Sequence, residues 1–228
     1  MVNEDLLNVD PPVRTPVIAV YRDSFTDQTG ARRSNSQFAT FSTAITQAPH
    51  AYLIRALQHA GKNNDGFFSV VERVGLDHVT KERQLIRSTR ESFDEDQKLP
   101  PLVFAGLIME GGVIGYESNT TSGGAGARYL GIGTSKAYRR DTVQVSLRTV
   151  SVTTGEVLME VLVSKTILSA SLDNDVFRFV ADSTELVEVE GGVVRNESVN
   201  IALQAAIETA VLQTIEEGVS YGYWTVRR

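Results

Sequence analysis

The spacing of apolar residues in the first half of the chain changes period several times. A short β-branched run over 16–21 predicts a buried strand, and residues 42–60 then place apolar side chains at helical spacing until Gly61 ends the pattern. A further strand is predicted over 67–71 and a further helix over 75–90. This half therefore alternates between strands and helices.

The second half carries three longer strands and one long helix. The strands are predicted over 103–116, 141–153 and 156–168, with the last two joined by a short turn. An amphipathic helix is predicted over 198–217. Together these elements predict an α+β fold, a sandwich of sheet and helices.

Two segments, 120–140 and 170–190, fit neither the sheet nor the helices. Each is about twice the roughly 9 to 11 residues that a tilted strand needs to cross a bilayer, so each could form one membrane-spanning hairpin. The first is rich in glycine, with four basic residues and no acid, whereas the second has six acids and one arginine. The second also alternates apolar and polar residues, which suits either a transmembrane strand or an ordinary exposed hairpin.

Composition narrows the class of protein. The 228 residues are 42% hydrophobic, which fits one globular domain, and the net charge of -6 argues against a nucleic-acid partner. Without cysteine there is no disulfide and no thiolate metal site, and no apolar run reaches about 18 residues. The first residues lack the pattern of a signal peptide, which indicates a cytoplasmic or a processed form.

No motif indicates an enzyme. The run from Gly124 to Tyr129 begins like a dinucleotide fingerprint, but Tyr129 stands where the third glycine is needed and no helical pattern follows. The chain has no P-loop and no Gly-x-Ser-x-Gly elbow, and its three histidines form no His-Glu-x-x-His motif. We therefore expect no catalytic residue, no metal and no cofactor.

A series of short motifs points to a family. In chain order they are Phe41 to Ala44, Glu82 to Arg87, Leu107 to Asn119, Ser122 to Gly133, Ser164 to Ser169, Val176 to Phe179 and Ala206 to Thr209. With them the chain resembles the CsgG family of curli secretion channels from about Pro16 to Trp224. The resemblance implies a Gram-negative outer-membrane lipoprotein that assembles as a nonamer, in which each protomer lends two β-hairpins to one shared transmembrane β-barrel. The segments 120–140 and 170–190 are the expected hairpins.

The resemblance also implies a division of the chain. Residues 1–15 are expected to be a linker in the anchor region, and residues 16–228 the CsgG-like domain. Members of the family carry an acylated cysteine after processing, which this sequence lacks. We therefore expect a non-lipidated form, produced in the cytoplasm, of a protein that works in the outer membrane facing the periplasm.

A loop before the first helix narrows the channel in that family, with the pattern Tyr-x-x-x-Asn-Phe-Ser-Thr. This sequence has Ser36 at the tyrosine position, Thr40 at the asparagine position and Phe41 at the phenylalanine position, while Phe38 could supply a second aromatic ring. The expected constriction loop, about 32–43, thus departs from the pattern where serine fills less volume than tyrosine. Phe41 has a second interpretation, as a hydrophobic staple packed on the following helix.

Three charged residues match positions that face the lumen in the family, namely Arg128, Glu188 and Glu190. The alternative interpretation is that they are solvated charges on exposed hairpins. The charged residues between 81 and 90 are likewise either a solvated helix face or contacts between neighbouring protomers.

The resemblance implies passive export of unfolded curli subunits through the barrel and its periplasmic constriction ring. The expected partners are further copies of the chain, the curli subunits, periplasmic and surface curli accessory proteins, and outer-membrane lipid. A different hypothesis keeps the same fold as a soluble periplasmic binding or adaptor module that forms no pore. Two hairpins of bilayer length favour the channel, because an adaptor has no need of them.

Overall fold

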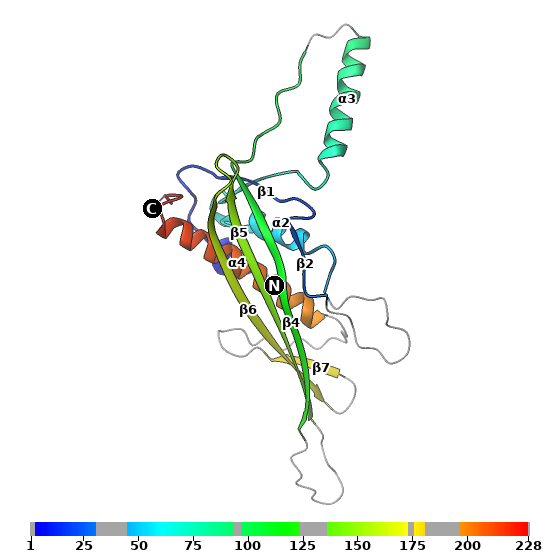
Figure 1. Cartoon of the computed structure of the whole chain (residues 1–228), viewed down its shortest axis with the longest axis vertical. Helices are drawn as coiled ribbons and strands as arrows, with labels where there is room; N and C mark the ends of the chain where they lie inside the picture. Colours follow the sequence, from blue (N-terminus) through cyan, green and yellow to red (C-terminus); the bar gives the residue numbers. More distant parts are fainter. Residues whose placement is uncertain are drawn as a thin grey trace, which may run out of the picture.

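The computed structural model describes residues 3–30, 45–93, 97–123, 136–172, 176–180 and 197–227. Within them the chain forms a mixed sheet with helices packed on one face (Figure 1). In order, the elements are α1 (Glu4–Leu7), β1 (Val17–Ala19), β2 (Phe25–Asp27), α2 (Pro49–His59), a 3-10 turn (Lys62–Asn64), β3 (Ser69–Val71), α3 (Leu76–Ser92), β4 (Leu107–Gly123), β5 (Lys136–Ser151), β6 (Val157–Leu172), β7 (Val176–Val180) and α4 (Glu197–Ser220).

The sheet combines a short parallel part with a long antiparallel part. Its strand order is β3-β1-β4-β5-β6-β7, and β2 pairs separately with β4. The short strands β1, β2 and β3 form the parallel pairs, while β4 through β7 pair antiparallel in chain order. Consecutive antiparallel strands are the arrangement that hairpin connections produce.

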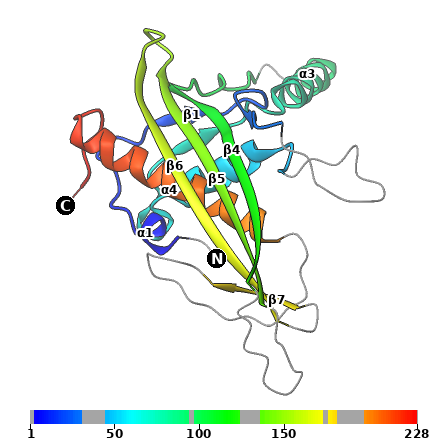
Figure 2. The ribbon, with the colours of Figure 1, turned by 60° about the horizontal axis from the view of Figure 1, so that its bottom comes forward.

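The core lies between this sheet and the helices α2 and α4. On β5, Val143, Val145 and Leu147 are buried and alternate with more exposed residues, as expected for a strand covered on one face. Figure 2 shows α4 crossing the sheet behind β5 and β6. Leu203 and Ile207 of this helix are completely buried. Burial of each such side chain contributes about 1.5–3 kcal/mol, which makes this layer the main source of stability.

The structure confirms the α+β class and most of the expected elements. All five expected strands are present, although β4 begins only at Leu107 and continues to Gly123. The helix expected over 42–60 begins at Pro49, because residues 45–48 are not helical and proline suits the first helical turn. The part of that prediction over 42–44 lies outside the described residues.

The segment 1–15, which we expected to be a linker, packs onto the fold. It contains α1, whose Leu6 is fully buried, and Pro12 forms a β-bridge with Val226 near the C-terminus. The backbone N–H of Asn3 donates a hydrogen bond of 2.9 Å to the carboxylate of Glu208, a buried residue of α4. A hydrogen bond from the chain thus satisfies this buried carboxylate, and the segment is part of the domain.

None of the described helices is both long and apolar enough to cross a membrane.

Candidate functional site

The residues that the sequence suggested as functional all lie outside the described part of the chain. Residues 31–44 contain Ser36, Phe38, Thr40 and Phe41; residues 124–135 contain Arg128; and residues 181–196 contain Glu188 and Glu190. Their roles therefore stay predictions. The structure describes the strands and helices that flank these three segments.

The strand β2 leads into residues 31–44, and it pairs with β4 at two consecutive glycines. Phe25 and Asp27 pair with Gly111 and Val113 of β4. A Cβ atom on Gly112 would lie 2.2 Å from the carbonyl oxygen of Thr26, and one on Gly111 would lie 2.1 Å from that of Ser146. Only glycine at position 112 allows β2 to approach so closely, so Gly112 positions the start of this segment, whereas Gly111 allows the close approach of β5.

Both ends of the segment meet at the carboxylate of Asp27. On one side, the N–H and the hydroxyl of Thr29 donate to its Oδ1, at 3.0 Å and 2.7 Å. On the other side, Nε2 of Gln47, just before α2, lies 3.5 Å from its Oδ2. The residues on both sides of 31–44 are thus joined at the Asp27 side chain, which we call the base of this segment. The buried Ile45 anchors the chain just after the segment.

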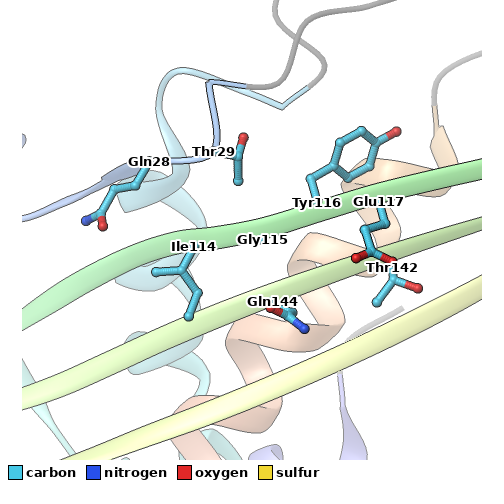
Figure 3. A pocket seen from close by; sticks show the side chains of 8 residues that line it. All are labelled: Gln28, Thr29, Ile114, Gly115, Tyr116, Glu117, Thr142 and Gln144. Atoms are coloured by element: carbon cyan, nitrogen blue, oxygen red, sulfur yellow. The ribbon is translucent and has the colours of Figure 1, made fainter.

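A shallow, mainly polar pocket of about 300 Å³ opens beside this base. Figure 3 shows the side chains of Gln28 and Thr29, which follow β2, beside those of β4 and β5. The lining residues are Gln28, Thr29, Ile114, Gly115, Tyr116, Glu117, Thr142 and Gln144. Its small size and polar walls do not fit the mainly apolar, enclosed pocket that a small-molecule ligand or cofactor usually occupies.

Hydrogen bonds tie the strands together where they leave the helical layer. The hydroxyl of Tyr116 donates to Oδ1 of Asp141 at 3.2 Å, and Asp141 is fully buried. Next to Asp141 on β5, the hydroxyl of Thr142 lies 3.0 Å from that of Thr166 and joins β5 to β6. These bonds replace apolar packing at the point where the sheet continues towards the two expected hairpins.

The pairing of β4 with β5 continues without interruption into the first expected hairpin segment, 120–140. The pairing of β4 with β5 extends to Gly123 opposite Lys136. The second expected segment, 170–190, begins where β6 pairs antiparallel with β7, and Ala170 pairs with Arg178 there. The described strands therefore include the first part of both segments, and nothing described tests whether they enter a barrel.

Two histidines at opposite ends of α2 have unsatisfied ring atoms. In the described residues, Nδ1 of His50 and Nδ1 of His59 are buried without a hydrogen-bond partner. Burial lowers the pKa of His50, and Arg22 lowers it further. Burial likewise lowers the pKa of His59, with smaller effects of nearby charged residues. The described ranges hold no cluster of three or more His, Asp or Glu side chains that could hold a metal ion.

The sequence reasoning did not find Asp27, Gly112 or Glu208 as structural determinants. The Gly111-Gly112 pair inside a strand was an available signal, because glycine in a strand often marks a close backbone approach. No comparable signal connects Asp27 with Gln47, since their contact depends on the two ends of the segment meeting in space.

Comparison with known proteins gives a consistent family. The family model described as "Curli production assembly/transport component CsgG" matches residues 2–228. The protein of that name from Escherichia coli K12 is 39% identical over 98% of this chain and 79% of its own length. The proteins from Salmonella typhimurium and Citrobacter koseri show the same identity and coverage.

Similarity to solved structures is low. A neuraminyllactose-binding hemagglutinin homolog from Helicobacter pylori covers 91% of this chain and 88% of its own, with 8% identity and a TM-score of 0.37. The sequence relatives and the family model are far more specific. They confirm the family that the short motifs indicated: this chain belongs to the CsgG family, the curli production assembly/transport components.

Proposed function

We propose that this protein is the protomer of an oligomeric outer-membrane channel through which unfolded curli subunits are secreted. The relatives that share 39% identity over almost the whole chain are named as curli production assembly/transport components, which supports a transport role rather than an enzymatic one. In this proposal the protein makes no covalent bond and needs no cofactor.

The observation that carries the proposal is the length of the antiparallel strands. The strand β4 has 17 residues and therefore spans about 55 Å, several times the usual strand. Figure 1 shows β4, β5 and β6 continuing well past the helices that cover the sheet. Among the residues that the structure describes, no helix covers these strand ends, as expected if they continue into a membrane barrel.

Assembly follows from the chemistry of strand edges. In lipid, every backbone N–H and C=O needs a partner within the protein, so four neighbouring strands of one chain would leave two unpaired edges. Further copies of the chain, each adding its strands in the same order, remove those edges by closing the barrel. We therefore propose a closed homo-oligomer, a nonamer as the family resemblance implies, with 120–140 and 170–190 as its hairpins.

A second feature supports oligomerisation. The chain leaves the body after β3, forms α3 and comes back to β4, and none of its described residues between 72 and 106 is buried. An isolated helix of this length is marginally stable in water, so α3 needs a neighbour. The exposed apolar residues of this excursion, Phe93 and Phe104 above all, favour a protein neighbour over solvent.

The constriction of the channel is the proposed role of residues 31–44. The base at Asp27 holds both ends of the segment together beside the point where the strands leave the body. Phe41, with Phe38, Thr40 and Ser36, would form a ring at this level when the copies assemble. An aromatic ring would exclude folded proteins and offer passing side chains weak, non-specific contact. In the barrel beyond it, Arg128, Glu188 and Glu190 would face the water-filled lumen.

The same proposal specifies the cellular location of the protein and its partners. The strands would lie in outer-membrane lipid, and the helical body would face the periplasm. The curli subunits and the periplasmic and surface accessory proteins of curli assembly would be its partners. A form without a lipidated cysteine would lack the contribution of acyl chains to anchoring, about 0.8 kcal/mol for each buried CH₂.

Electrical recording from planar lipid bilayers tests the proposal. The protein is purified in detergent, its ring order is determined by electron microscopy, and the oligomer is added to the bilayer. We expect ring-shaped particles and stable, uniform conductance steps. A variant that lacks residues 124–135 and 181–196 is the control, because it keeps the helical body and should give no steps. Well-formed oligomers without conductance would favour the soluble adaptor instead.

A further inference from the structure

A groove lies on the side of α4 that faces away from the sheet. It has a volume of about 620 Å³ and lies between α1, the second half of α4 and the C-terminal residues. Its apolar lining residues are Val9, Leu212, Ile215, Val219 and Val226, and its polar ones are Asp5, Asn8, Asp10 and Glu216. The groove is therefore apolar along its length, with three acids and no base.

The groove exists because α4 is apolar on more than one side. Its sheet-facing side is buried in the core, yet Leu212, Ile215 and Val219 place apolar side chains along a second side at helical spacing. A helix that is apolar all round is normally buried all round. Within the described residues α1 covers only part of this second side, and Val219 is 37% exposed.

The walls of the groove are held in place before any partner arrives. Leu6 anchors α1 in the core, and Asn3 is bound to Glu208 of α4. On the opposite wall, the N–H of Arg227 donates to the carbonyl of Pro11 at 2.8 Å. A preformed groove favours binding, because little ordering entropy is lost when it is filled.

A surface complementary to the groove lies on the part of the chain between β3 and β4 that contains α3. Residues 97–105, here named the return segment, run from α3 back to the sheet and include Leu102, Val103 and Phe104, which are 38%, 58% and 84% exposed. Pro100 and Pro101 restrict the backbone just before them. The only charged residue of the return segment is Lys98. It is thus an extended, apolar, weakly basic stretch, complementary to an apolar groove with acids at its rim.

The two surfaces cannot meet within one chain. Figure 2 shows α3 projecting at the upper right of the molecule, while α1 and the C-terminal end of α4 lie at the left. We propose that the return segment of one copy docks into the α1–α4 groove of the next copy. This inference rests on the proposed function, since it specifies the contact that joins protomers outside the membrane.

The proposed contact is heterologous, because it joins two different surfaces of the same chain. Repeated head to tail, such contacts close into a ring when the rotation between copies fits. Val103 and Phe104 would lie against Val219 and the half-buried Leu212, with the buried Ile215 beneath them, and Lys98 would lie near the acidic rim. Every copy would use one groove and one return segment, so a closed ring leaves neither surface exposed.

Disulfide cross-linking tests this contact in a chain that has no cysteine of its own. The double variant Val103→Cys/Val219→Cys is oxidised mildly and separated under denaturing, non-reducing conditions. We expect a ladder of covalent dimers, trimers and larger species, and covalent dimers alone when the two single variants are mixed. Val103→Cys/Leu162→Cys is the matched control: Leu162 is also exposed, at 66%, but lies on the uncovered face of the sheet.

A second pair, Leu102→Cys/Val226→Cys, is tested in parallel, because a disulfide also needs suitable distances and angles between the two chosen positions. Light scattering of the reduced proteins reports whether oligomers form at all. Intact oligomers that cross-link through neither pair, or no better than the control, would overturn the contact while leaving the proposed channel standing. A chain that stays monomeric in detergent and in lipid would instead refute the oligomeric channel itself.

Discussion

Thr26 and Gly112 lie so close together that no other residue fits at position 112. A Cβ atom there would be 2.2 Å from the Thr26 carbonyl oxygen, and the φ angle of Gly112 is +157°, which other residues rarely adopt. Backbone atoms cannot move aside without breaking the pairing of β2 with β4. The position of residues 31–44 on the body therefore depends on this glycine.

Replacing Gly112 with alanine should destabilise the protein by about 2–4 kcal/mol, from overpacking and from the unfavourable φ angle. Urea unfolding monitored by circular dichroism measures the change. Gly155→Ala is the control, because Gly155 also has a positive φ, +74°, but has open space around it. It should cost about 1 kcal/mol. Equal losses in the two variants would show that the close approach of β2 is not what Gly112 provides.

The hydrogen bond from the Asn3 N–H to Glu208 should keep α1 packed against the rest of the domain. Glu208→Ala removes the acceptor of the Asn3 N–H and of the Gln204 side-chain amide, which lies 2.8 Å from its Oε1. We expect a loss of about 1–3 kcal/mol, the range for a buried polar group left without its partner. Hydrogen exchange should rise in α1 before it rises elsewhere. Gln213→Ala, at an exposed position of α4, should leave both measurements unchanged.

The two half-buried histidines of α2, whose Nδ1 atoms are buried, predict a loss of stability in mild acid. The pKa values of His50 and His59 are lowered from the ordinary value of 6.5 in the folded state, in each case mainly by burial. Below that value the unfolded chain binds more protons than the folded one, so stability is at its full value above about pH 6.5 and is lost as the pH falls towards the lowered folded pKa values. Protonation would also place a charged ring N–H in a buried site without an acceptor.

Urea unfolding at a series of pH values between 7.5 and 5, which brackets the ordinary histidine pKa of about 6.5, checks this prediction. The double variant His50→Gln/His59→Gln should flatten the slope of stability against pH in that range. His78→Gln, on the exposed surface of α3, is the control and should keep the slope of the original protein. A slope that is the same in all three proteins would contradict a role of the buried histidines.

Periodicity was most informative for elements in which a long face is buried, although it also predicted α3, which buries none of its described residues. The strand β5 alternates over Val143, Val145 and Leu147, and α4 repeats its apolar residues over six turns, so the buried face was visible in the sequence alone. The strand β2 and the helix α1 have three and four residues, too few to show a period. They form because Gly112 and Glu208, which are distant in sequence, hold them.

The family was also predictable from sequence, because its motifs extend through the chain, and the family match over residues 2–228 confirmed it. The contacts that position the candidate site could not be predicted from the sequence in the same way. The closure at Asp27 involves Gln47, 20 residues further along, and the packing of 1–15 involves a helix at the other end of the chain. Contacts of this kind follow from the folded arrangement and leave no local pattern.

The proposed constriction predicts opposite changes in conductance for two substitutions in one segment. Phe41→Ala should raise the single-channel conductance, since it removes an aromatic ring from the narrowest level. Ser36→Tyr should lower it, since it restores the bulk that the family pattern places there. Phe38→Ala shows whether a second ring contributes, and Val13→Ala, at an exposed position outside this segment, is the control. If Phe41 is instead a staple on α2, Phe41→Ala would lower the unfolding temperature and leave the conductance unchanged.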